Sequence, residues 1–229
     1  MTDRVDFEVT PEGWYEEIEG GFFGILGERF GDSGDAAGLE RDIRARQEHI
    51  EVQHASWIED EQSRSHLRFP ALALAGYRAL RGVLPEDEAV TLLAEALIGP
   101  GRPHVYEGTK RALDDAPDPF TLMTRISKEK EASFYGRTFA FERPQDDEHA
   151  YLLNVTRCFW HRFFATNKAL ELMSVFCEWD TSWMDAVDPG GHGFRSERPT
   201  TLGYGGDACR FWFIRSNPAR TPADRQSSD

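Results

Sequence analysis

The sequence lacks an apolar run long enough to cross a membrane, and it is poor in basic residues for its acidic content. Its 229 residues include 26 Lys and Arg against 40 Asp and Glu, a formal net charge of −14 at pH 7. Nucleic-acid binding needs concentrated Lys and Arg to contact phosphates, and anionic membrane surfaces repel such a charge. The first residues, Met1–Asp6, lack the apolar segment of a secretory signal. We therefore expect no nucleic-acid partner, no membrane partner and a cytoplasmic location.

Cysteine is also scarce, and all of it lies in the last third of the chain, at Cys158, Cys177 and Cys209. Three thiols cannot all pair within one chain, and without a secretory signal they are expected to stay reduced. The histidines are scattered, so we expect no metal and no other cofactor. Zinc remains an alternative, because Cys158 with His161 and Cys177 with Asp180 each have the spacing of two ligands on one helical face.

The hydrophobic pattern changes its period once along the chain. Residues 39–132 show helical spacing, whereas residues 133–216 contain strand-like segments separated by turns and short helices. Helices followed by a small antiparallel sheet with interleaved helices indicate an α+β fold. We expect one such domain over 39–216, an acidic N-terminal extension at 1–38 and a disordered tail at 217–229.

Several boundaries follow from local signals. One long, mostly exposed helix is predicted from 39 to about 65, and a more apolar helix is predicted to start at Phe69–Pro70, with Pro70 in its first turn. Acidic residues at Glu86–Glu88 open another helix, because they interact favourably with its dipole. Strands are predicted at 139–142, 151–156, 194–202 and 208–214.

Reactive side chains recur among the aromatic residues of the C-terminal part. Arg157-Cys158 closes a predicted strand, and His161 follows one helical turn later. A nearby positive charge or histidine lowers the pKa of a thiol and favours the nucleophilic thiolate. Cys158 is therefore the preferred nucleophile and is predicted to be the most reactive thiol. Cys177 and Asp180 lie three residues apart and face the same way on a regular helix. Buried free cysteine is also a common apolar filler, so a purely structural role stays open for each thiol.

An ordered set of motifs in this part resembles the L-2-amino-thiazoline-4-carboxylic acid hydrolase family. The resemblance is strongest over 135–215 and looser over 40–130. It implies hydrolytic opening, at a C–N bond, of a small cyclic amidine that bears an amino-acid carboxylate, which gives a carbamoyl amino acid. The motifs are Arg157-Cys158, Leu170-Glu171-Leu172, Cys177-Glu178-Trp179-Asp180, Phe194, Arg198, Thr201-Leu202, Gly206 and Cys209-Arg210-Phe211.

This hydrolase hypothesis requires an attacking group, a proton donor and a cation for the substrate carboxylate. Asp180 could orient a base or bind the amidine, and Arg198 has the geometry for a bidentate grip on a carboxylate. We predict that Arg157, Cys158, Asp180 and Arg198 converge on one pocket. The predicted catalytic residues are Cys158, Asp180, His161 and Cys177, and the predicted substrate-binding residues are Arg157, Arg198, Thr201, Asn154 and Cys209.

Two other functions stay open at this point. A family member could instead close a small ring, such as an aziridine or a related azacycle, in specialised-metabolite or antibiotic biosynthesis. The chain could also be a non-catalytic acidic subunit of a complex. The expected partner is a small amino-acid-like substrate, and both homo- and hetero-oligomers are compatible with the sequence.

Overall fold

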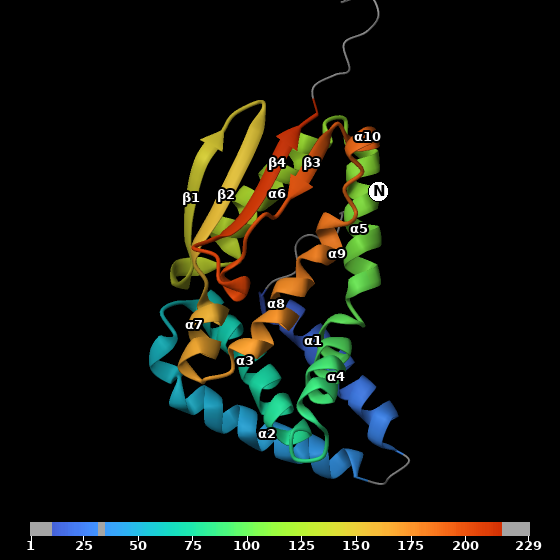
Figure 1. Cartoon of the computed structure of the whole chain (residues 1–229), viewed down its shortest axis with the longest axis vertical. Coiled ribbons are helices and arrows are strands. Elements are labelled where there is room, and N and C mark those ends of the chain that lie inside the picture. Colours follow the sequence, from blue (N-terminus) through green and yellow to red (C-terminus); the bar gives the residue numbers. More distant parts are fainter. Residues whose placement is uncertain (1–10, 32–34, 217–229) are drawn as a thin grey trace, which may run out of the picture.

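The computed structural model describes residues 11–31 and 35–216, which form an elongated molecule with helices at one end and a sheet at the other (Figure 1). Helices occupy the N-terminal half, and the C-terminal half contains a small antiparallel sheet with helices between its strands. This order confirms the predicted α+β class. The predicted tail at 217–229 and the first ten residues of the predicted extension lie outside the described residues.

The helical end is organised around α3, which contacts the helices on either side of it in the sequence. Most of its residues from Leu67 to Leu80 are buried, because Ala and Leu follow one another with few polar interruptions. A helix that is apolar on most faces can be buried on most faces. The elements of this end are α1 (Pro11–Phe30), α2 (Ala36–Gln53), the 3₁₀ turn η2 (Ala55–Trp57), α3 (Glu61–Leu80) and α4 (Glu86–Ile98).

The predicted single helix from 39 to 65 is wrong, because the chain breaks between α2 and α3. Asp60 accepts a hydrogen bond from the Ser63 backbone N–H (2.7 Å), and the Ser63 hydroxyl accepts one from the Asp60 N–H (2.9 Å). This reciprocal capping box satisfies backbone donors at a helix start and places the beginning of α3 at Glu61. Pro70 consequently lies inside α3 and not in its first turn.

Helix α1 lies in the predicted N-terminal extension and contributes to the helical core. Tyr15, Ile18, Phe22 and Leu26 recur at helical spacing and are buried against the neighbouring helices. Gly76 of α3 allows this close approach, since a Cβ atom there would lie 2.7 Å from the Phe22 Cζ. The helical core therefore begins well before residue 39.

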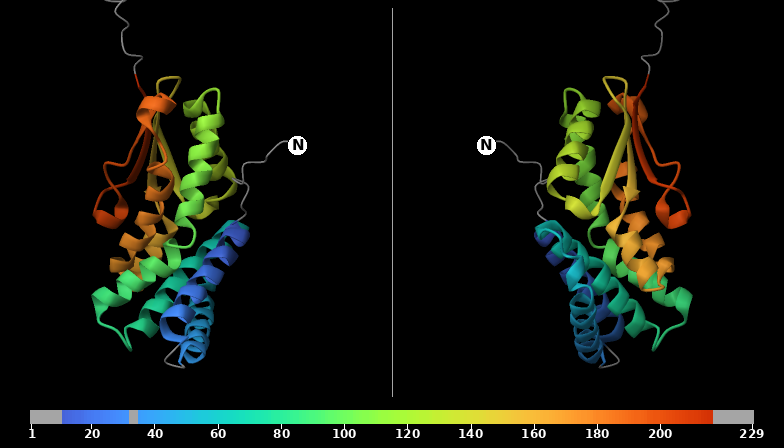
Figure 2. Two further views of the ribbon diagram at one scale, coloured as in Figure 1. Left: turned by 90° about the vertical axis from the view of Figure 1, so that its right-hand side faces the viewer. Right: turned by 90° about the vertical axis from the view of Figure 1, so that its left-hand side faces the viewer.

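The described residues form a four-stranded antiparallel sheet in the order β1-β2-β4-β3. Tyr151, Leu153 and Val155 alternate along β2 with less buried residues and pack on the inner face. Helices α5 and α6 cover this face, as the side views show (Figure 2). The bounds are β1 (Ala140–Asp146), β2 (Ala150–Arg157), β3 (Phe194–Glu197), β4 (Cys209–Arg215), α5 (Arg102–Asp115) and α6 (Pro119–Ser133).

Short helices connect the sheet to the helical end. Because the strands are antiparallel, one end of the sheet contains the start of β1, the end of β2, the start of β4 and the end of β3. That end of the sheet faces the helical end of the molecule (Figure 1). The connecting elements are η3 (Gly136–Thr138), α7 (Phe159–Thr166), η4 (Leu170–Leu172), α8 (Met173–Trp179), α9 (Thr181–Met184), α10 (Pro189–His192) and η5 (Leu202–Tyr204).

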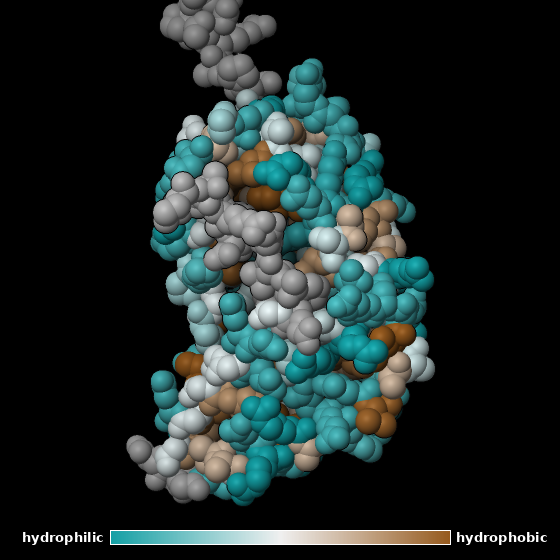
Figure 3. Space-filling view, turned by 180° about the vertical axis from the view of Figure 1, so that it is seen from behind, coloured by the Kyte–Doolittle hydropathy of each residue, from teal (hydrophilic) through white to brown (hydrophobic). Residues whose placement is uncertain are grey.

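The surface seen from behind is mainly polar, with separate small apolar patches over the described residues (Figure 3). None of the helices in residues 11–31 and 35–216 combines the length and apolar character needed to cross a membrane.

Candidate functional site

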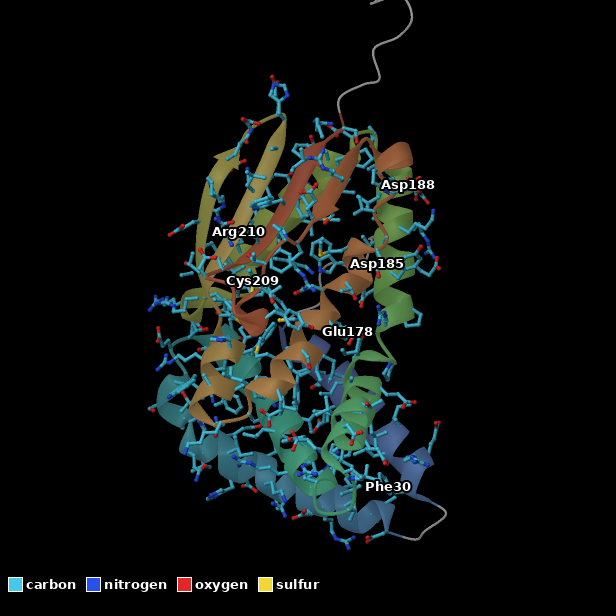
Figure 4. The ribbon with its side chains drawn as sticks, viewed as in Figure 1. Phe30, Glu178, Asp185, Asp188, Cys209 and Arg210 are labelled. Atoms are coloured by element: carbon cyan, nitrogen blue, oxygen red, sulfur yellow. The ribbon has the colours of Figure 1, made fainter. Side chains whose placement is uncertain are left out.

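The three thiols lie together where the end of the sheet that faces the helices meets α7 and α8. Cys158 precedes α7, Cys177 lies in α8 and Cys209 begins β4. Figure 4 shows Cys209 at the end of the sheet that faces the helices. The η5 turn touches two of the thiols, since the Leu202 N–H donates to the Cys209 Sγ (3.2 Å) and a Cβ atom on Gly203 would lie 2.8 Å from the Cys177 Sγ. All three cysteines are buried and free of disulfides.

Burial dominates the acid–base behaviour of these thiols. It raises the pKa of the Cys158 thiol well above its usual range, raises that of Cys209 to about 12 and raises that of Cys177. The backbone N–H groups of His161 and Trp160, in the first turn of α7, lower the pKa of Cys158 but do not offset desolvation. The thiols are therefore protonated at neutral pH, which contradicts the reasoning that made Cys158 a ready nucleophile.

Asp180 and Arg198 form the charged centre of the site. The Arg198 Nη1 donates to the Asp180 Oδ2 (3.3 Å) and to the Cys177 carbonyl oxygen (2.6 Å), and the Trp183 Nε1 donates to the Asp180 Oδ1 (3.4 Å). The Asp180 side chain stays 25% exposed. Burial nevertheless raises the pKa of its carboxyl, although the Arg198 charge acts to lower it. A carboxyl that is enclosed, accessible to water and raised in pKa is suited to proton transfer.

A pocket of about 360 Å³ lies beside Arg198 and is lined by residues on both sides of the η5 turn, whereas neither Asp180 nor a thiol lines it. Thr201 is buried there, and Tyr204 is exposed. The Thr201 hydroxyl accepts a hydrogen bond from the Tyr204 N–H (3.3 Å), and the Thr201 carbonyl accepts one from the Gly206 N–H (2.9 Å), so the turn is well defined. The volume lies at the small end of ligand pockets and fits a small molecule.

A family model described as L-2-amino-thiazoline-4-carboxylic acid hydrolase matches residues 64–213, which are 150 of the 229 residues. The chain belongs to the L-2-amino-thiazoline-4-carboxylic acid hydrolase family. The match runs from α3 to β4 and includes the thiols, Asp180, Arg198 and the η5 turn, whereas α1 and α2 precede it. Searches of curated proteins and of solved structures returned no match.

Within this family member, Arg157 does not join the predicted group. Its side chain lies on the exposed end of β2, and Nη2 donates to the carbonyl oxygens of Arg137 (2.9 Å) and Phe139 (3.4 Å). These carbonyls lie in and just after η3, where β1 has not yet begun, so they need another donor. Arg157 thus secures the start of β1, and the expected convergence holds only for Asp180 and Arg198 beside the thiols.

Asn154 also lies away from the thiols. Leu153 and Val155 face the helices, so Asn154 between them faces the opposite side of the sheet. Its Oδ1 accepts a hydrogen bond from the Trp212 Nε1 (3.3 Å), which joins neighbouring strands on that side. His161 is half-buried, and its backbone N–H lowers the pKa of the Cys158 thiol.

Sequence reasoning missed Tyr135, which follows α6 and lies at the site. Burial raises the pKa of the Tyr135 phenol, and the charges of Asp180, Cys158 and Cys209 act in the same direction, so the hydroxyl lies among these groups. Tyr135 precedes the family-like motifs. The change of hydrophobic period near residue 134 was the signal for a structural junction there.

The part of the chain that the structure describes contains no set of side chains arranged to bind a metal ion. No group of three or more His, Cys, Asp or Glu side chains is arranged there to hold an ion. The zinc alternative, which needs four ligands in tetrahedral geometry, therefore gains no support from the three neighbouring thiols.

Proposed function

We propose that this chain hydrolyses a small cyclic amidine that bears an amino-acid carboxylate, as 2-amino-thiazoline-4-carboxylate does. The observation that carries the proposal is the enclosed, water-accessible Asp180 carboxyl, held by Arg198 beside a small pocket. Membership of a family named for this hydrolysis supports the same substrate class.

In the proposed reaction a water molecule attacks the amidine carbon. Asp180 takes a proton from that water as the C–O bond forms and passes it to the ring nitrogen, whose C=N bond becomes a single bond. Asp180 then takes the proton of the new hydroxyl group and gives it to the same nitrogen as the ring C–N bond breaks and the C=O bond forms. The product is a ring-opened amino acid with a free amine and with the carbamoyl group on the other ring heteroatom. One water is consumed and Asp180 ends the cycle as a carboxylate. Its raised pKa favours the uptake step, and Arg198 keeps its oxygens in place.

The test compares two neighbouring carboxylates. Asp180→Asn should lower kcat for 2-amino-thiazoline-4-carboxylate by at least about a hundredfold, the usual contribution of a positioned acid–base group. Asp185→Asn is the matched control, because the Asp185 side chain is 63% exposed and its oxygen lies as far as 3.9 Å from the nitrogen of its partner Arg102. Product is measured by mass spectrometry in ¹⁸O-labelled water, with one label expected in the carbamoyl group. Full activity of Asp180→Asn, or no turnover by the natural chain, would refute the proposal.

Cys158 distinguishes this mechanism from direct attack by a thiol. Its buried, protonated thiol is a poor nucleophile, so Cys158→Ser should keep kcat within about tenfold of the natural value. Loss of more than a hundredfold in a folded Cys158→Ser variant would restore the thiol as nucleophile. Thermal unfolding checks that the variant is folded.

Ring closure is the second candidate function, because the same carboxyl could take a proton from an amine in place of water. Trp183 donates a hydrogen bond to Asp180, and the Asp180 charge raises the pKa of the Tyr135 phenol, so aromatic side chains border the carboxyl. In this case Asp180 would take a proton from an amino group while that nitrogen displaces a leaving group on the same substrate. Incubation with an open-chain amino acid that carries a leaving group, followed by detection of the azacycle, separates this function from hydrolysis.

A further inference from the structure

The pocket beside Arg198 is lined by a cation and by no anion. Arg198 is the only charged residue among the described residues that line it, and the others are proline, threonine, tyrosine and glycine. The overall charge does not explain this, because the whole chain carries a net charge of −14. Charge complementarity therefore favours a ligand with a negative charge, and the volume of about 360 Å³ limits that ligand to a small molecule.

The guanidinium of Arg198 has more hydrogen-bond donors than the fold uses. Its Nη1 donates to the Asp180 Oδ2 (3.3 Å) and to the Cys177 carbonyl oxygen (2.6 Å). Its Nε and Nη2 make no hydrogen bond with residues 11–31 and 35–216, although the side chain is only 13% exposed. All the nitrogens of a guanidinium carry N–H groups, and Nε with Nη2 forms an edge that fits a carboxylate. That edge is available to a ligand.

A neighbouring arginine shows what a fully paired guanidinium looks like in this protein. Arg210, in β4, binds both carboxylate oxygens of Asp207, through Nη1 (2.7 Å) and Nη2 (3.0 Å). Asp180 accepts from Arg198 through Nη1 alone. Unmet donors on an enclosed cation cost free energy unless a ligand or water binds them. A ligand carboxylate on Nε and Nη2 would give Arg198 the bidentate partner that Arg210 has in Asp207.

Tyr204 is the second feature of the pocket that points to a ligand. It lines the pocket, and its side chain is 68% exposed, so burial in the core does not explain an aromatic residue here. Its backbone is held by the N–H bonds to the Thr201 carbonyl (3.2 Å) and hydroxyl (3.3 Å), and Gly205 follows at a φ of 82°. An aromatic ring fixed in this way can cover a small ring bound in the pocket.

We infer that this pocket binds the carboxylate of the substrate, with Nε and Nη2 of Arg198 as donors and Tyr204 covering the heterocycle. The inference rests on the proposed function for the class of substrate, a small heterocycle with one carboxylate. Arg198 then has two tasks, because it holds Asp180 through Nη1 and the substrate through its other edge. The amidine carbon of such a heterocycle is only a few bonds from the carboxylate, so the bound ring extends along the guanidinium toward Asp180.

The test measures binding without turnover. Thiazolidine-4-carboxylate, which lacks the amidine and cannot be hydrolysed by the proposed reaction, and its carboxamide are titrated into the full chain by calorimetry. Arg198→Gln should weaken binding of the carboxylate at least about tenfold and leave binding of the carboxamide within about threefold, because only the carboxylate makes charged hydrogen bonds. Tyr204→Ala should weaken both compounds alike, by about twofold to tenfold, because it removes a ring contact and no charge.

Arg195→Gln is the matched control, because Arg195 lies on β3, pairs with Glu197 and does not line the pocket. It should leave both affinities unchanged. Tyr204→Ala tests the pocket even where loss of the pair with Asp180 unfolds Arg198→Gln, since Tyr204 is exposed.

Three results would overturn the inference. They are an unaltered preference for the carboxylate in folded Arg198→Gln, unchanged affinities in Tyr204→Ala, and equal or absent binding of the two compounds by the natural chain. Carboxylate binding that depends on Arg198 and Tyr204, in a chain that fails to hydrolyse the cyclic amidine, supports the inference and refutes only the proposed function.

Discussion

The helical end and the site at its junction with the sheet differ in what surrounds their buried polar groups. In the helical end, the buried Gln47 donates to the Tyr15 hydroxyl (2.6 Å) and to Glu51 (2.8 Å), and the buried His54 contacts the Ile50 carbonyl (2.9 Å). At the junction, Asp180 is paired with Arg198, which lines a pocket, and burial raises the pKa of the Asp180 carboxyl. The polar side chains named in the helical end bind one another inside the fold, whereas the charged pair of the site borders a pocket.

The difference has an energetic meaning. A buried charge without full compensation costs stability, whereas a buried polar group with its hydrogen bonds costs little. Folds therefore keep such charges mainly where a ligand or a reaction uses them. The comparison predicts that substitutions in the helical end change stability, and that substitutions at the junction change activity with little loss of stability.

The largest expected effect on stability is in the helical core. Phe22 is fully buried between α1 and α3, so Phe22→Ala should lower the free energy of unfolding by about 3 to 5 kcal/mol through lost burial and a cavity. Urea unfolding followed by circular dichroism measures the change. Val52→Ala serves as the control, because Val52 is 70% exposed and should change stability by less than about 0.5 kcal/mol. An equal loss in both variants would contradict the comparison.

The next largest expected effect is on the rate at which the three thiols are alkylated. Because burial raises the pKa of all three, including that of Cys209 to about 12, each should react with iodoacetamide at pH 7.5 at least about a hundredfold more slowly in the folded protein than in urea. Mass spectrometry resolves the three sites. Labelling of Cys158 at its unfolded rate would show that this thiol is exposed and activated, as the sequence alone suggested.

His66 links the two regions and makes stability depend on pH. Its Nε2–H donates a hydrogen bond to the Phe134 carbonyl oxygen (2.7 Å), and burial lowers the pKa of the imidazole to about 4. A histidine with a lowered folded-state pKa contributes stability that is complete above pH 6.5 and is lost as the pH falls toward 4. At pH 5 the loss should be about 2 kcal/mol, at 1.4 kcal/mol per pH unit.

The check is His66→Gln, which can keep a donor for the Phe134 carbonyl but does not titrate. Urea unfolding of both proteins at pH 7.5 and pH 5 gives the change in stability of each. The natural chain should lose about 2 kcal/mol more than the variant between these pH values. Parallel losses would mean that His66 is as easily protonated in the folded state as in the unfolded state.

The sequence predicted the class of fold and the family, but only part of the site. Periodicity located α4, β2 and β4 well, since long regular patterns reflect which face is buried. It missed the break before α3, because the Asp60–Ser63 capping box consists of polar residues that continue an apparently helical pattern. Local propensity cannot tell a cap from a helix interior unless the partner atoms are known.

Neighbours in sequence were a poor guide to neighbours in the site. Arg157 adjoins Cys158, but its guanidinium binds carbonyls at the start of β1, whereas Tyr135, which follows α6, lies at the site. Burial, which sets the pKa of every group there, depends on residues brought together by the whole fold.

The smallest expected effect tests the comparison most directly, because it should have the opposite sign to the first. Asp180→Asn replaces a carboxylate whose charge is disfavoured by burial with a neutral amide that keeps an oxygen for Arg198. The free energy of unfolding should stay unchanged or rise by up to about 1 kcal/mol, while hydrolysis is lost. Asp185→Asn, which removes an exposed carboxylate 3.9 Å from Arg102, should instead leave function intact and lower stability by no more than about 0.5 kcal/mol. Urea unfolding and activity measurements on both variants give the two quantities. If Asp180→Asn unfolds the protein as Phe22→Ala is expected to do, Asp180 is a structural residue, and the junction is built by the same rule as the helical core.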